Sequence, residues 1–545
     1  MKIKKLLFTA IATIVFIAGA NAQNVTIPDA NFKAALVANA SINNNMDAEI
    51  QVSEAAAYTG AIHVSQLGIT DLTGIAAFVL LDSLDCSFNY VYIGDPMGEG
   101  ILFLGNLNLS ANIALTYLKC SDNALTSLNV SANTALTSLD CSGNDITSLN
   151  VSSCTALNSL DCSSNQIAGL DISSNLALTY LDCSYNLGVD AYQNEYFIYY
   201  YYMDSLDVSA NIALTILKCN NNGLLSINTT GLTGLTYLDC SNNGRLNYIS
   251  SPGEAPGYYV ISTPIFDFES NLALAYLNCS SNGLSSLDVS ENAALTYLDC
   301  SNYSLSNGEG DFIGGGTLSS LDFSSNVALV YLNCSNNFSS SLNVSGNVAL
   351  TSLYCIHNSL SSLDVSSNLA LTYLNCYSNQ LTSLDVSTCS TLAFLYCFDN
   401  NLTSLNVNNG YNINMFDFQG MDGNNYPAFL AYNNPNLSCI EVDNVAWSNA
   451  NWANNIDATA SFSENCSAVG ILDNDESTAI LAYPNPTTGT IYLSNSANIT
   501  LTDLSGKLLL EQKNTKQLDL SSLPAGMYFL NVGENNKHTF KVIKE

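Results

Sequence analysis

The chain has 545 residues, a formal net charge of −33 at neutral pH and 17 cysteines. Only four of its 13 basic residues lie in the segment 23–478, where 41 acidic residues give a net charge of 4 − 41 = −37. A surface of this sign repels phosphate, so the composition excludes nucleic acid as a partner and disfavours anionic lipids. Cationic ligands, divalent ions, basic proteins and neutral glycans remain open.

Residues 1–22 have the pattern of a secretory signal peptide. Three lysines precede an apolar run, and the small-residue site Ala20-Asn21-Ala22 predicts cleavage between Ala22 and Gln23. No later stretch has the roughly 18 uninterrupted apolar residues that a membrane-spanning helix needs. We therefore expect a soluble, exported protein without a transmembrane segment.

Residues 23–80 precede the repeats and are expected to form an N-terminal cap. The segment 27–36 predicts a capped amphipathic helix. The spacing of a calcium-binding loop, with an apolar eighth position, is present in Asn43, Asn45, Asp47 and Glu54. Because the first position is asparagine and the usual glycine is Ala48, two interpretations stay open, a calcium site and a simple polar turn.

Residues 81–430 repeat one motif. Eight of the twelve intervals between the cysteines of this motif are 21 residues long, and the thirteen cysteines are Cys86, Cys120, Cys141, Cys162, Cys183, Cys219, Cys240, Cys279, Cys300, Cys334, Cys355, Cys376 and Cys397. A fixed period of this size predicts a solenoid, whose coils bury their apolar faces against one another. Each coil has two half-units, Leu-x-x-Leu-x-Cys-x-x-Asn and Leu-x-x-Leu-Asp-Val-Ser-x-Asn. Their alternation predicts two short parallel strands on opposite faces.

An asparagine follows the first strand of every coil except at Tyr303, and a second asparagine column follows the second strand. These amides are expected to satisfy buried backbone groups in the turns. On these motifs the chain resembles bacterial leucine-rich repeat proteins with two-part, 21-residue coils in which Cys replaces a core Leu. The resemblance covers about residues 81–410 and implies a β-rich solenoid.

The thirteen repeat cysteines are expected to be free, buried thiols. Stacked neighbours would lie about 4.8 Å apart with parallel Cβ vectors, whereas a disulfide requires Cβ atoms about 3.8 Å apart. Zinc is disfavoured because no Cys-x-x-Cys pair is present. Cys154 and Cys389 occupy the second asparagine column. Cys439 and Cys466 lie beyond the last coil, in 431–468, and are predicted to form a disulfide that clamps a C-terminal cap.

Two outward columns on the first strand form a candidate binding face. They contain Tyr117, Tyr180, Tyr237, Tyr276, Tyr297, Tyr331 and Tyr373 in one column, and Asp140, Asp161, Asp182, Asp239 and Asp299 in the other. Tyrosine is a rigid amphipathic anchor, and carboxylates could orient sugar hydroxyls or meet a basic partner. The alternative is that tyrosine favours strands and aspartate keeps the surface soluble. Calcium held between the stacked aspartates of the segment 140–182 is a further alternative.

Four long intervals expand at one point of the coil, after the turn that ends the first strand. The added stretches are 90–103, 187–202, 244–262 and 304–316. A shared phase predicts that all four leave the same edge of the solenoid. The second stretch has the densest aromatic run, which includes Tyr196, Tyr199 and Tyr200. Such loops either carry binding residues or pack on one another without a binding role.

Residues 469–478 form a polar, acidic linker, and the composition changes over 479–545. Three motif blocks, Tyr483-Pro-Asn-Pro-Thr-Thr-Gly489, Leu523-Pro-Ala-Gly-Met-Tyr528 and Phe540-Lys-Val-Ile-Lys544, accompany the alternating strands of a small β-sandwich. On these blocks the tail resembles the type A C-terminal sorting domain of the type IX secretion system of Bacteroidota. The resemblance implies export by that machinery, removal of the tail, and release or lipopolysaccharide-linked anchoring at the surface.

The sequence favours a secreted or cell-surface protein that binds a protein or glycan ligand, for adhesion or capture. The alternative is a passive structural or surface-layer protein. Enzymatic activity is disfavoured, because the chain has three histidines and no nucleophile elbow, metal-binding histidine pair or phosphate loop. We expect no cofactor other than the calcium considered above, and a monomer.

Overall fold

The computed structural model describes residues 23–92, 101–193, 196–201, 203–249, 257–302, 318–419, 425–466, 482–483, 486–504, 506–532 and 538–544. For the segments 187–201 and 245–262 it describes the backbone alone. The chain divides into two compact units, residues 1–466 and 467–545. The predicted signal peptide lies outside the described residues. Within the described part, no helix has the length and apolar character of a membrane span.

The N-terminal cap consists of α2 (Ala30–Val37), α3 (Val52–Ala57) and the short helix η1 (Ile75–Ala77). Helix α2 begins at Asp29, whose carboxylate accepts hydrogen bonds from the backbone N–H groups of Asn31 and Phe32 at 3.0 and 2.9 Å. The predicted helix is thus present, but it spans Ala30–Val37 where the sequence predicts 27–36. Its residues Phe32 and Leu36 are buried.

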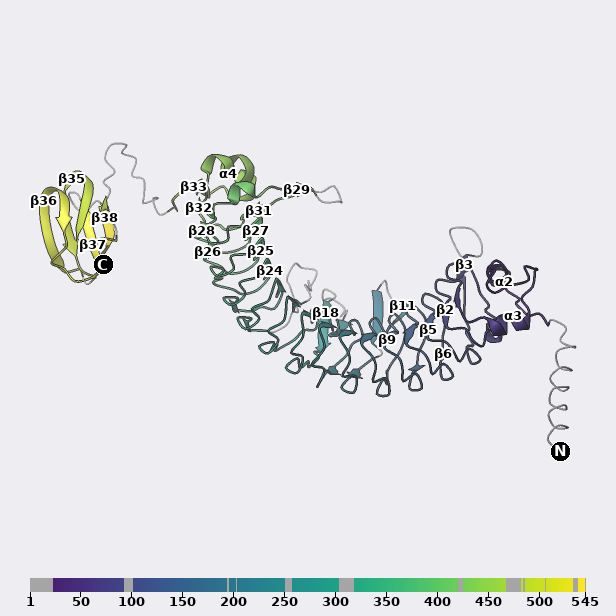
Figure 1. The fold of residues 1–545 in the computed structure, drawn as a ribbon. Coiled ribbons are helices and arrows are strands. Elements are labelled where there is room, and N and C mark those ends of the chain that lie inside the picture. Colours follow the sequence, from purple (N-terminus) through teal and green to yellow (C-terminus); the bar gives the residue numbers. More distant parts are fainter. Residues whose placement is uncertain are drawn as a thin grey trace, which may run out of the picture. The chain divides into compact units, whose positions relative to one another are not determined.

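The first strands of the coils form one 15-stranded parallel sheet. In spatial order it contains β1 (Ala61–His63), β2 (Ser83–Asp85), β5 (Tyr117–Lys119), β7 (Ser138–Asp140), β9 (Ser159–Asp161), β10 (Tyr180–Asp182), β14 (Ile216–Lys218), β16 (Tyr237–Asp239), β19 (Tyr276–Asn278), β20 (Tyr297–Asp299), β22 (Tyr331–Asn333), β24 (Ser352–Tyr354), β25 (Tyr373–Asn375), β27 (Phe394–Tyr396) and β31 (Phe429–Leu430). Figure 1 shows this sheet on the inner side of the curved row of coils. Each strand pairs in register with the next, so equivalent residues form straight columns.

The outer side carries shorter sheets. They are β6 (Leu128–Asn129) with β8 (Leu149–Asn150), β13 (Ser205–Asp207) with β15 (Ser226–Asn228), β21 (Ser320–Asp322) with β23 (Ser341–Asn343), and the series β26 (Ser383–Asp385), β28 (Ser404–Asn406), β32 (Cys439–Glu441) and β33 (Ser461–Ser463). The expectation of a second strand in every coil is wrong, since 170–172, 287–289 and 363–365 form none. The outer ladder is therefore interrupted at these coils, whereas the inner sheet is continuous.

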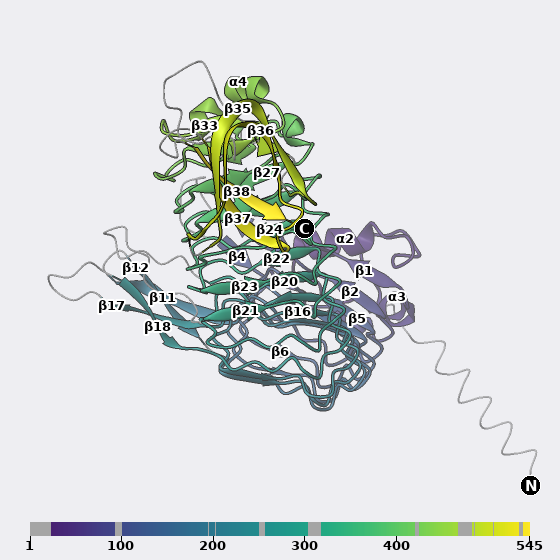
Figure 2. The same ribbon diagram turned by 90° about the vertical axis from the view of Figure 1, so that its left-hand side faces the viewer.

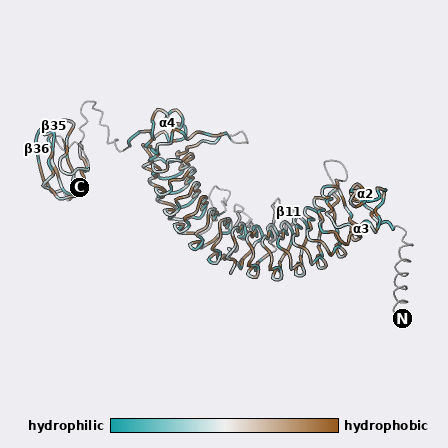
Figure 3. The backbone as a smooth tube through the Cα atoms, viewed as in Figure 1, coloured by the Kyte–Doolittle hydropathy of each residue, from teal (hydrophilic) through white to brown (hydrophobic). Residues whose placement is uncertain are grey.

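The core between the two faces is a stack of Leu and Cys layers. Leu374, Cys376, Leu384 and Val386 are buried, as the alternation predicts, and Figure 3 shows the hydropathy changing within each coil. All thirteen repeat cysteines are free and buried. Burial raises the pKa of the Cys376 thiol to about 12. Because the thiolate is the reactive form, these thiols are inert at neutral pH.

The first asparagine column joins successive coils. Asn379 Nδ2 donates to the carbonyl oxygens of Cys355 and Cys376 at 2.9 and 3.1 Å, and its Oδ1 accepts from the Leu360 backbone N–H at 3.1 Å. Where Tyr303 interrupts the column, Asn302 accepts from the backbone N–H of Gly283 at 2.8 Å. In the second column, the Cys154 thiol takes the place of the amide, with Sγ 3.6 Å from two carbonyl oxygens of the preceding coil.

Three of the four insertions form antiparallel hairpins within the described residues. They are β3 (Tyr90–Tyr92) with β4 (Ile101–Phe103), β11 (Leu187–Gln193) with β12 (Tyr196–Tyr201), and β17 (Arg245–Ile249) with β18 (Gly257–Ser262). Figure 2 shows β11, β12, β17 and β18 leaving one side of the repeat unit, as their shared phase predicts. The fourth insertion, 304–316, lies outside the described residues.

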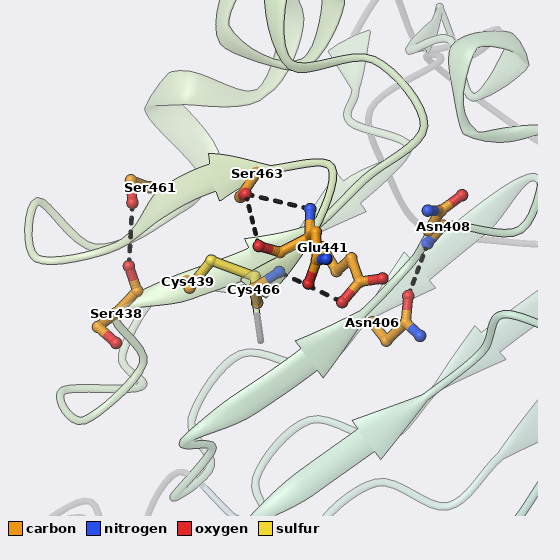
Figure 4. The surroundings of a disulfide bond; sticks show 9 residues. Asn406, Asn408, Ser438, Cys439, Glu441, Ser461, Ser463 and Cys466 are labelled. Carbon is orange, nitrogen blue, oxygen red and sulfur yellow. Dashed lines mark hydrogen bonds between the residues drawn. A yellow bond between two sulfur atoms is a disulfide. The ribbon is translucent and has the colours of Figure 1, made fainter. Parts of the chain in front are cut away.

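The C-terminal end of the first unit is closed by α4 (Val445–Trp452) and η3 (Ala453–Asn455). The Trp452 ring is buried and stacks on Phe429 with ring centroids 4.4 Å apart. Cys439, at the start of β32, forms a disulfide with Cys466, which follows β33 (Figure 4). This pairing, predicted from the sequence, ties the last two strands of the outer side together.

The second unit contains one five-stranded sheet with its own core. Its antiparallel strands are β34 (Ala482–Tyr483), β35 (Thr490–Thr502), β36 (Leu508–Asp519), β37 (Gly526–Val532) and β38 (His538–Lys544). The long strand β35 pairs with β34, β36 and β37. Ile499, Leu501, Leu518 and Leu530 are buried in its core.

Candidate binding face of the inner sheet

Four tyrosines form a continuous stack on the inner sheet. The rings of Tyr237, Tyr276, Tyr297 and Tyr331 follow one another with centroids 4.1, 4.3 and 4.4 Å apart and planes within 9° of parallel. The in-register strands place one ring on each coil, and all four rings are partly buried. The two middle rings, Tyr276 and Tyr297, therefore have both faces covered by neighbouring rings and present their edges to solvent.

The row continues where its column is interrupted by Ser352. The ring centroid of Tyr354, two residues further along the chain, lies 5.5 Å from that of Tyr331. The Tyr354 ring stacks on the Tyr373 ring, with centroids 4.8 Å apart. Phe394 follows Tyr373 at 5.8 Å. Tyr354 is not among the site residues predicted from the sequence, because it stands in the aspartate column. The sequence does contain an indication of its role: in the coil of β24, the tyrosine column has Ser352 and the aspartate column has Tyr354.

A short hairpin extends this row beyond the coils. Strands β29 (Phe418–Gln419) and β30 (Asn425–Tyr426) pair antiparallel, and the Phe418 ring lies 5.5 Å from Phe394 and 5.1 Å from Tyr426. The Tyr396 hydroxyl donates to the Pro427 carbonyl oxygen at 2.8 Å. We define the aromatic row as Tyr237, Tyr276, Tyr297, Tyr331, Tyr354, Tyr373, Phe394, Phe418 and Tyr426.

Two predicted site tyrosines lie outside the aromatic row. Ser138 and Ser159 separate Tyr117 from Tyr180, and Ile216 separates Tyr180 from Tyr237. The structure therefore brings together five of the seven predicted tyrosines.

Asp140, Asp161 and Asp182 of the acidic column lie on coils before the aromatic row, whereas Asp239 and Asp299 share coils with Tyr237 and Tyr297. Lys119 Nζ lies 2.9 Å from Asp140 Oδ2, and Lys218 Nζ lies 3.4 Å from Asp182 Oδ2. Between them, burial raises the pKa of Asp161, and its two acidic neighbours add to the shift. The same cause, burial, raises the pKa of Asp239, next to the aromatic row. Further along, Asp299 accepts a hydrogen bond from Asn333 Nδ2 at 3.2 Å.

A second aromatic stack lies at the turn that ends the first strand. Tyr377, Phe398 and Tyr432 follow one another with centroids 4.3 and 4.8 Å apart, and His357 meets Tyr377 edge-on at 5.1 Å. Our sequence analysis missed this stack. Its signal is the residue after each repeat cysteine, which is serine or asparagine up to Cys334 and then becomes Ile356, Tyr377 and Phe398.

For the tyrosines of the insertion hairpin β11–β12, the structure describes the backbone but not the side chains. Tyr199 lies opposite Val189, and Tyr200 lies opposite Gly188, in the hairpin β11–β12. Tyr196 lies opposite Gln193 at its far end. The side chains of this hairpin lie outside the described residues, so their proposed part in binding stays a prediction.

The calcium-like loop is closed by its own hydrogen bonds. Glu54 accepts from the backbone N–H groups of Asn45 and Gln51 at 3.2 and 2.9 Å and so caps α3. Asp47 Oδ2 accepts from the side-chain amides of Asn45 and Gln51. Asn43 Nδ2 donates to the Asp47 carbonyl oxygen at 2.8 Å. Across the described residues, no group of three or more His, Cys, Asp or Glu side chains is arranged to hold a metal ion.

We expect this loop to fold without calcium. Replacing Glu54 with alanine should lower the free energy of unfolding by about 1 to 2 kcal/mol, because the backbone N–H groups of Asn45 in the loop and Gln51 at the start of α3 lose their acceptor. Glu49→Ala, which removes an ion pair with Lys33, should cost less than about 1 kcal/mol. Thermal unfolding of the native chain should be the same in EDTA and in millimolar calcium. A higher melting temperature in calcium that Glu54→Ala abolishes would instead establish an ion site.

Comparison with known proteins identifies the tail. Residues 481–545 match the family described as the secretion system C-terminal sorting domain. The C-terminal unit is a sorting domain. The protein is therefore exported to the cell surface or the extracellular space, as predicted from the tail motifs.

Comparison with solved structures identifies the fold of the first unit. The functional domain of InlJ from Listeria monocytogenes, described as including a cysteine ladder, is similar at 24% identity with a TM-score of 0.51, over 96% of this chain and 98% of that one. A leucine-rich repeat protein of Leptospira interrogans is 14% identical with a TM-score of 0.41, over 76% and 93% of the two chains. The internalin InlF of L. monocytogenes is 15% identical with a TM-score of 0.37, over 81% and 96%. Comparison with curated protein sequences found no match. The likeness to InlJ confirms the solenoid predicted from the period and the leucine-rich repeat fold implied by the resemblance of the coil motifs.

Proposed function

We propose that the protein is an exported binding protein whose inner sheet captures an extracellular protein partner. The observation that carries this proposal is the aromatic row, which places a rigid line of ring edges and hydroxyls on an otherwise polar array. Aromatic side chains held in place by their neighbours lose little conformational entropy on binding, which is why they dominate recognition surfaces. The sorting domain supports the location, because it brings the array outside the cell.

The stacking of the row favours a protein ligand over a glycan. A sugar binds tyrosine best by packing its C–H groups against the ring face, but the faces of Tyr276 and Tyr297 are covered by the adjacent rings. Ring edges remain, and these suit apolar side chains of a polypeptide. The hydroxyls hydrogen-bond to one another along the row, and their remaining lone pairs suit backbone N–H groups. The neighbouring aspartates add negative potential, which favours a partner with basic side chains beside its apolar ones.

A passive structural role is the second candidate. In that case the stacked rings would serve only to stabilise the sheet, since aromatic pairs contribute about 0.5 to 1.5 kcal/mol beyond their buried area. The two roles predict different effects on ligand binding. Both predict some loss of stability when tyrosines of the aromatic row are replaced.

The test uses serine, which the same column already contains at Ser138, Ser159 and Ser352. In a screen of extracellular proteins and glycans, the native chain should retain a protein ligand, and Tyr276→Ser with Tyr297→Ser should weaken that binding at least tenfold. Tyr185→Ser is the matched control, because Tyr185 is exposed in a turn where other coils have Ser164 or Ser281. Equal binding by the double variant, or no ligand in the screen, would support the structural role. Retention of a glycan alone would contradict the preference for protein.

A further inference from the structure

One edge of the solenoid is almost free of charge. It is formed by the turns that lead from the second strand of each coil to the first strand of the next, and we call it the edge strip. Its twelve segments are 110–116, 131–137, 152–158, 173–179, 209–215, 230–236, 269–275, 290–296, 324–330, 345–351, 366–372 and 387–393. Among these seven-residue segments only Glu269 and Glu291 carry a charge, in a chain of net charge −33.

The edge strip exposes a column of aliphatic side chains. At the position after the second asparagine, seven of the twelve coils have a large aliphatic residue that is 54–68% exposed, and these are Ile113, Leu176, Ile212, Leu272, Val327, Val348 and Leu369. Single exposed apolar residues are ordinary on protein surfaces. Here the seven residues share one position of the coil, and Val327, Val348 and Leu369 lie on three consecutive coils and form a contiguous patch; such patches mark interaction sites.

Neighbouring polar groups on the strip are already engaged within the chain. Thr351 Oγ1 donates to the Val330 carbonyl oxygen at 3.1 Å, and Thr372 Oγ1 donates to the Thr351 carbonyl oxygen at 3.0 Å. Equivalent bonds recur along the strip, for example from Thr215 to Thr179. Because these threonine hydroxyl donors are used between coils, covering the strip leaves fewer polar groups to desolvate without a partner.

The strip is also sterically open. The insertions leave the coil at the turn after the first strand, whereas the strip is the turn after the second strand, so they lie on opposite edges (Figure 2). Twelve coils at about 4.8 Å each give a strip about 58 Å long, and a width of roughly 10 Å gives on the order of 600 Å². Pairing over the whole strip would bury about 1,200 Å² in total, which is the lower end of the range for specific interfaces and is enough for a weak, specific contact.

We propose that the edge strip is the contact between two copies of this chain, which would then be a dimer in place of the monomer expected from the sequence. Two strongly acidic arrays repel each other over most of their surface, and the strip is the edge along which they can approach without facing like charges. A two-fold axis in the plane of the curved row reverses the row and lays strip on strip. Such an isologous pairing closes with two copies. Both inner sheets then face the same side, so the dimer presents two copies of the aromatic row.

Sedimentation equilibrium of the chain from Gln23 to Glu545 tests this pairing. The native chain should form a dimer at micromolar concentration, and the dimer should tighten with added salt, because salt screens the repulsion between acidic surfaces but not the apolar contact. Val348→Asp with Leu369→Asp should weaken dimerisation at least tenfold, and Leu176→Asp with Ile212→Asp should do the same at a second part of the strip. Phe88→Asp with Phe338→Asp is the matched control, since it adds the same two charges at exposed apolar residues of the opposite edge.

A folding control and three possible results decide whether the edge strip is the dimer contact. Circular dichroism spectra equal to those of the native chain would show that each variant is folded, since all four replaced side chains are mostly exposed. A native chain that stays monomeric at all concentrations and salts would overturn the proposal. So would a dimer that all the strip variants retain. Binding to neutral phosphatidylcholine vesicles by a monomeric native chain, lost in Val348→Asp with Leu369→Asp, would assign the strip to a lipid surface and would also overturn it.

Discussion

Replacing Asn379 with alanine should lower the free energy of unfolding by about 3 kcal/mol or more. The substitution leaves the carbonyl oxygens of Cys355 and Cys376 without their donor and the Leu360 N–H without its acceptor, and all three groups are buried between coils. Because coils are stabilised by their neighbours, the damage should spread to adjacent coils and make urea unfolding less cooperative. Urea titration followed by far-UV circular dichroism measures both effects.

Asn401→Ala is the control for that measurement. Asn401 is an exposed asparagine of the next coil, and only its backbone N–H makes a hydrogen bond to Leu381. Its replacement should change the stability by less than about 0.5 kcal/mol. If the two variants unfold at the same urea concentration, the asparagine column does not hold the coils together.

Removing the disulfide should uncouple the C-terminal cap from the solenoid. Cys439 and Cys466 close a loop with a sequence separation of 27 residues, and the loss of such a cross-link costs about 3 to 4 kcal/mol. The chain has two tryptophans, Trp447 and Trp452, and both belong to α4. Tryptophan fluorescence therefore reports the cap alone, while circular dichroism reports the whole array.

In the native chain, the two signals should change together as urea increases. In the Cys439→Ser, Cys466→Ser double variant, the fluorescence transition should move to lower urea and separate from the circular dichroism transition. Dithiothreitol should reproduce this shift in the native chain and have no further effect on the double variant, because the repeat cysteines are already free thiols. Coincident transitions in all samples would show that the disulfide does not stabilise the cap.

The sequence predicts which residues of the candidate site share a column, but it does not predict which aromatic rings contact one another. The repeat period alone places Tyr237, Tyr276 and Tyr297 at equivalent positions, and the in-register sheet confirms this arrangement. The period does not reveal that Tyr354 fills the gap at Ser352, because that contact joins different columns of adjacent coils. Nor does it show the ring orientation that covers the tyrosine faces, which depends on how neighbouring side chains pack.

The outer side shows the limit of reasoning from one repeat. The half-unit pattern of alternating residues is as clear in 363–365 as in β26, yet only the latter forms a strand. Strand formation there requires hydrogen bonds to the neighbouring coils, as β26 makes to β28. The residue pattern of a single repeat does not specify those bonds.

The sequence by itself determined the solenoid, its inward and outward columns, the free repeat cysteines, the Cys439–Cys466 pair and the sorting tail. The features of the array follow from the period, because in a stacked array each residue is surrounded mainly by residues of the same position in neighbouring coils. The disulfide pair and the sorting tail follow from cysteine positions and motifs outside the repeats. The tertiary structure decided the aromatic row with its covered ring faces, the absence of outer strands from several coils and the exposed, uncharged edge strip. These features depend on the angle, distance and edge at which one coil meets the next, which become defined when the coils pack together.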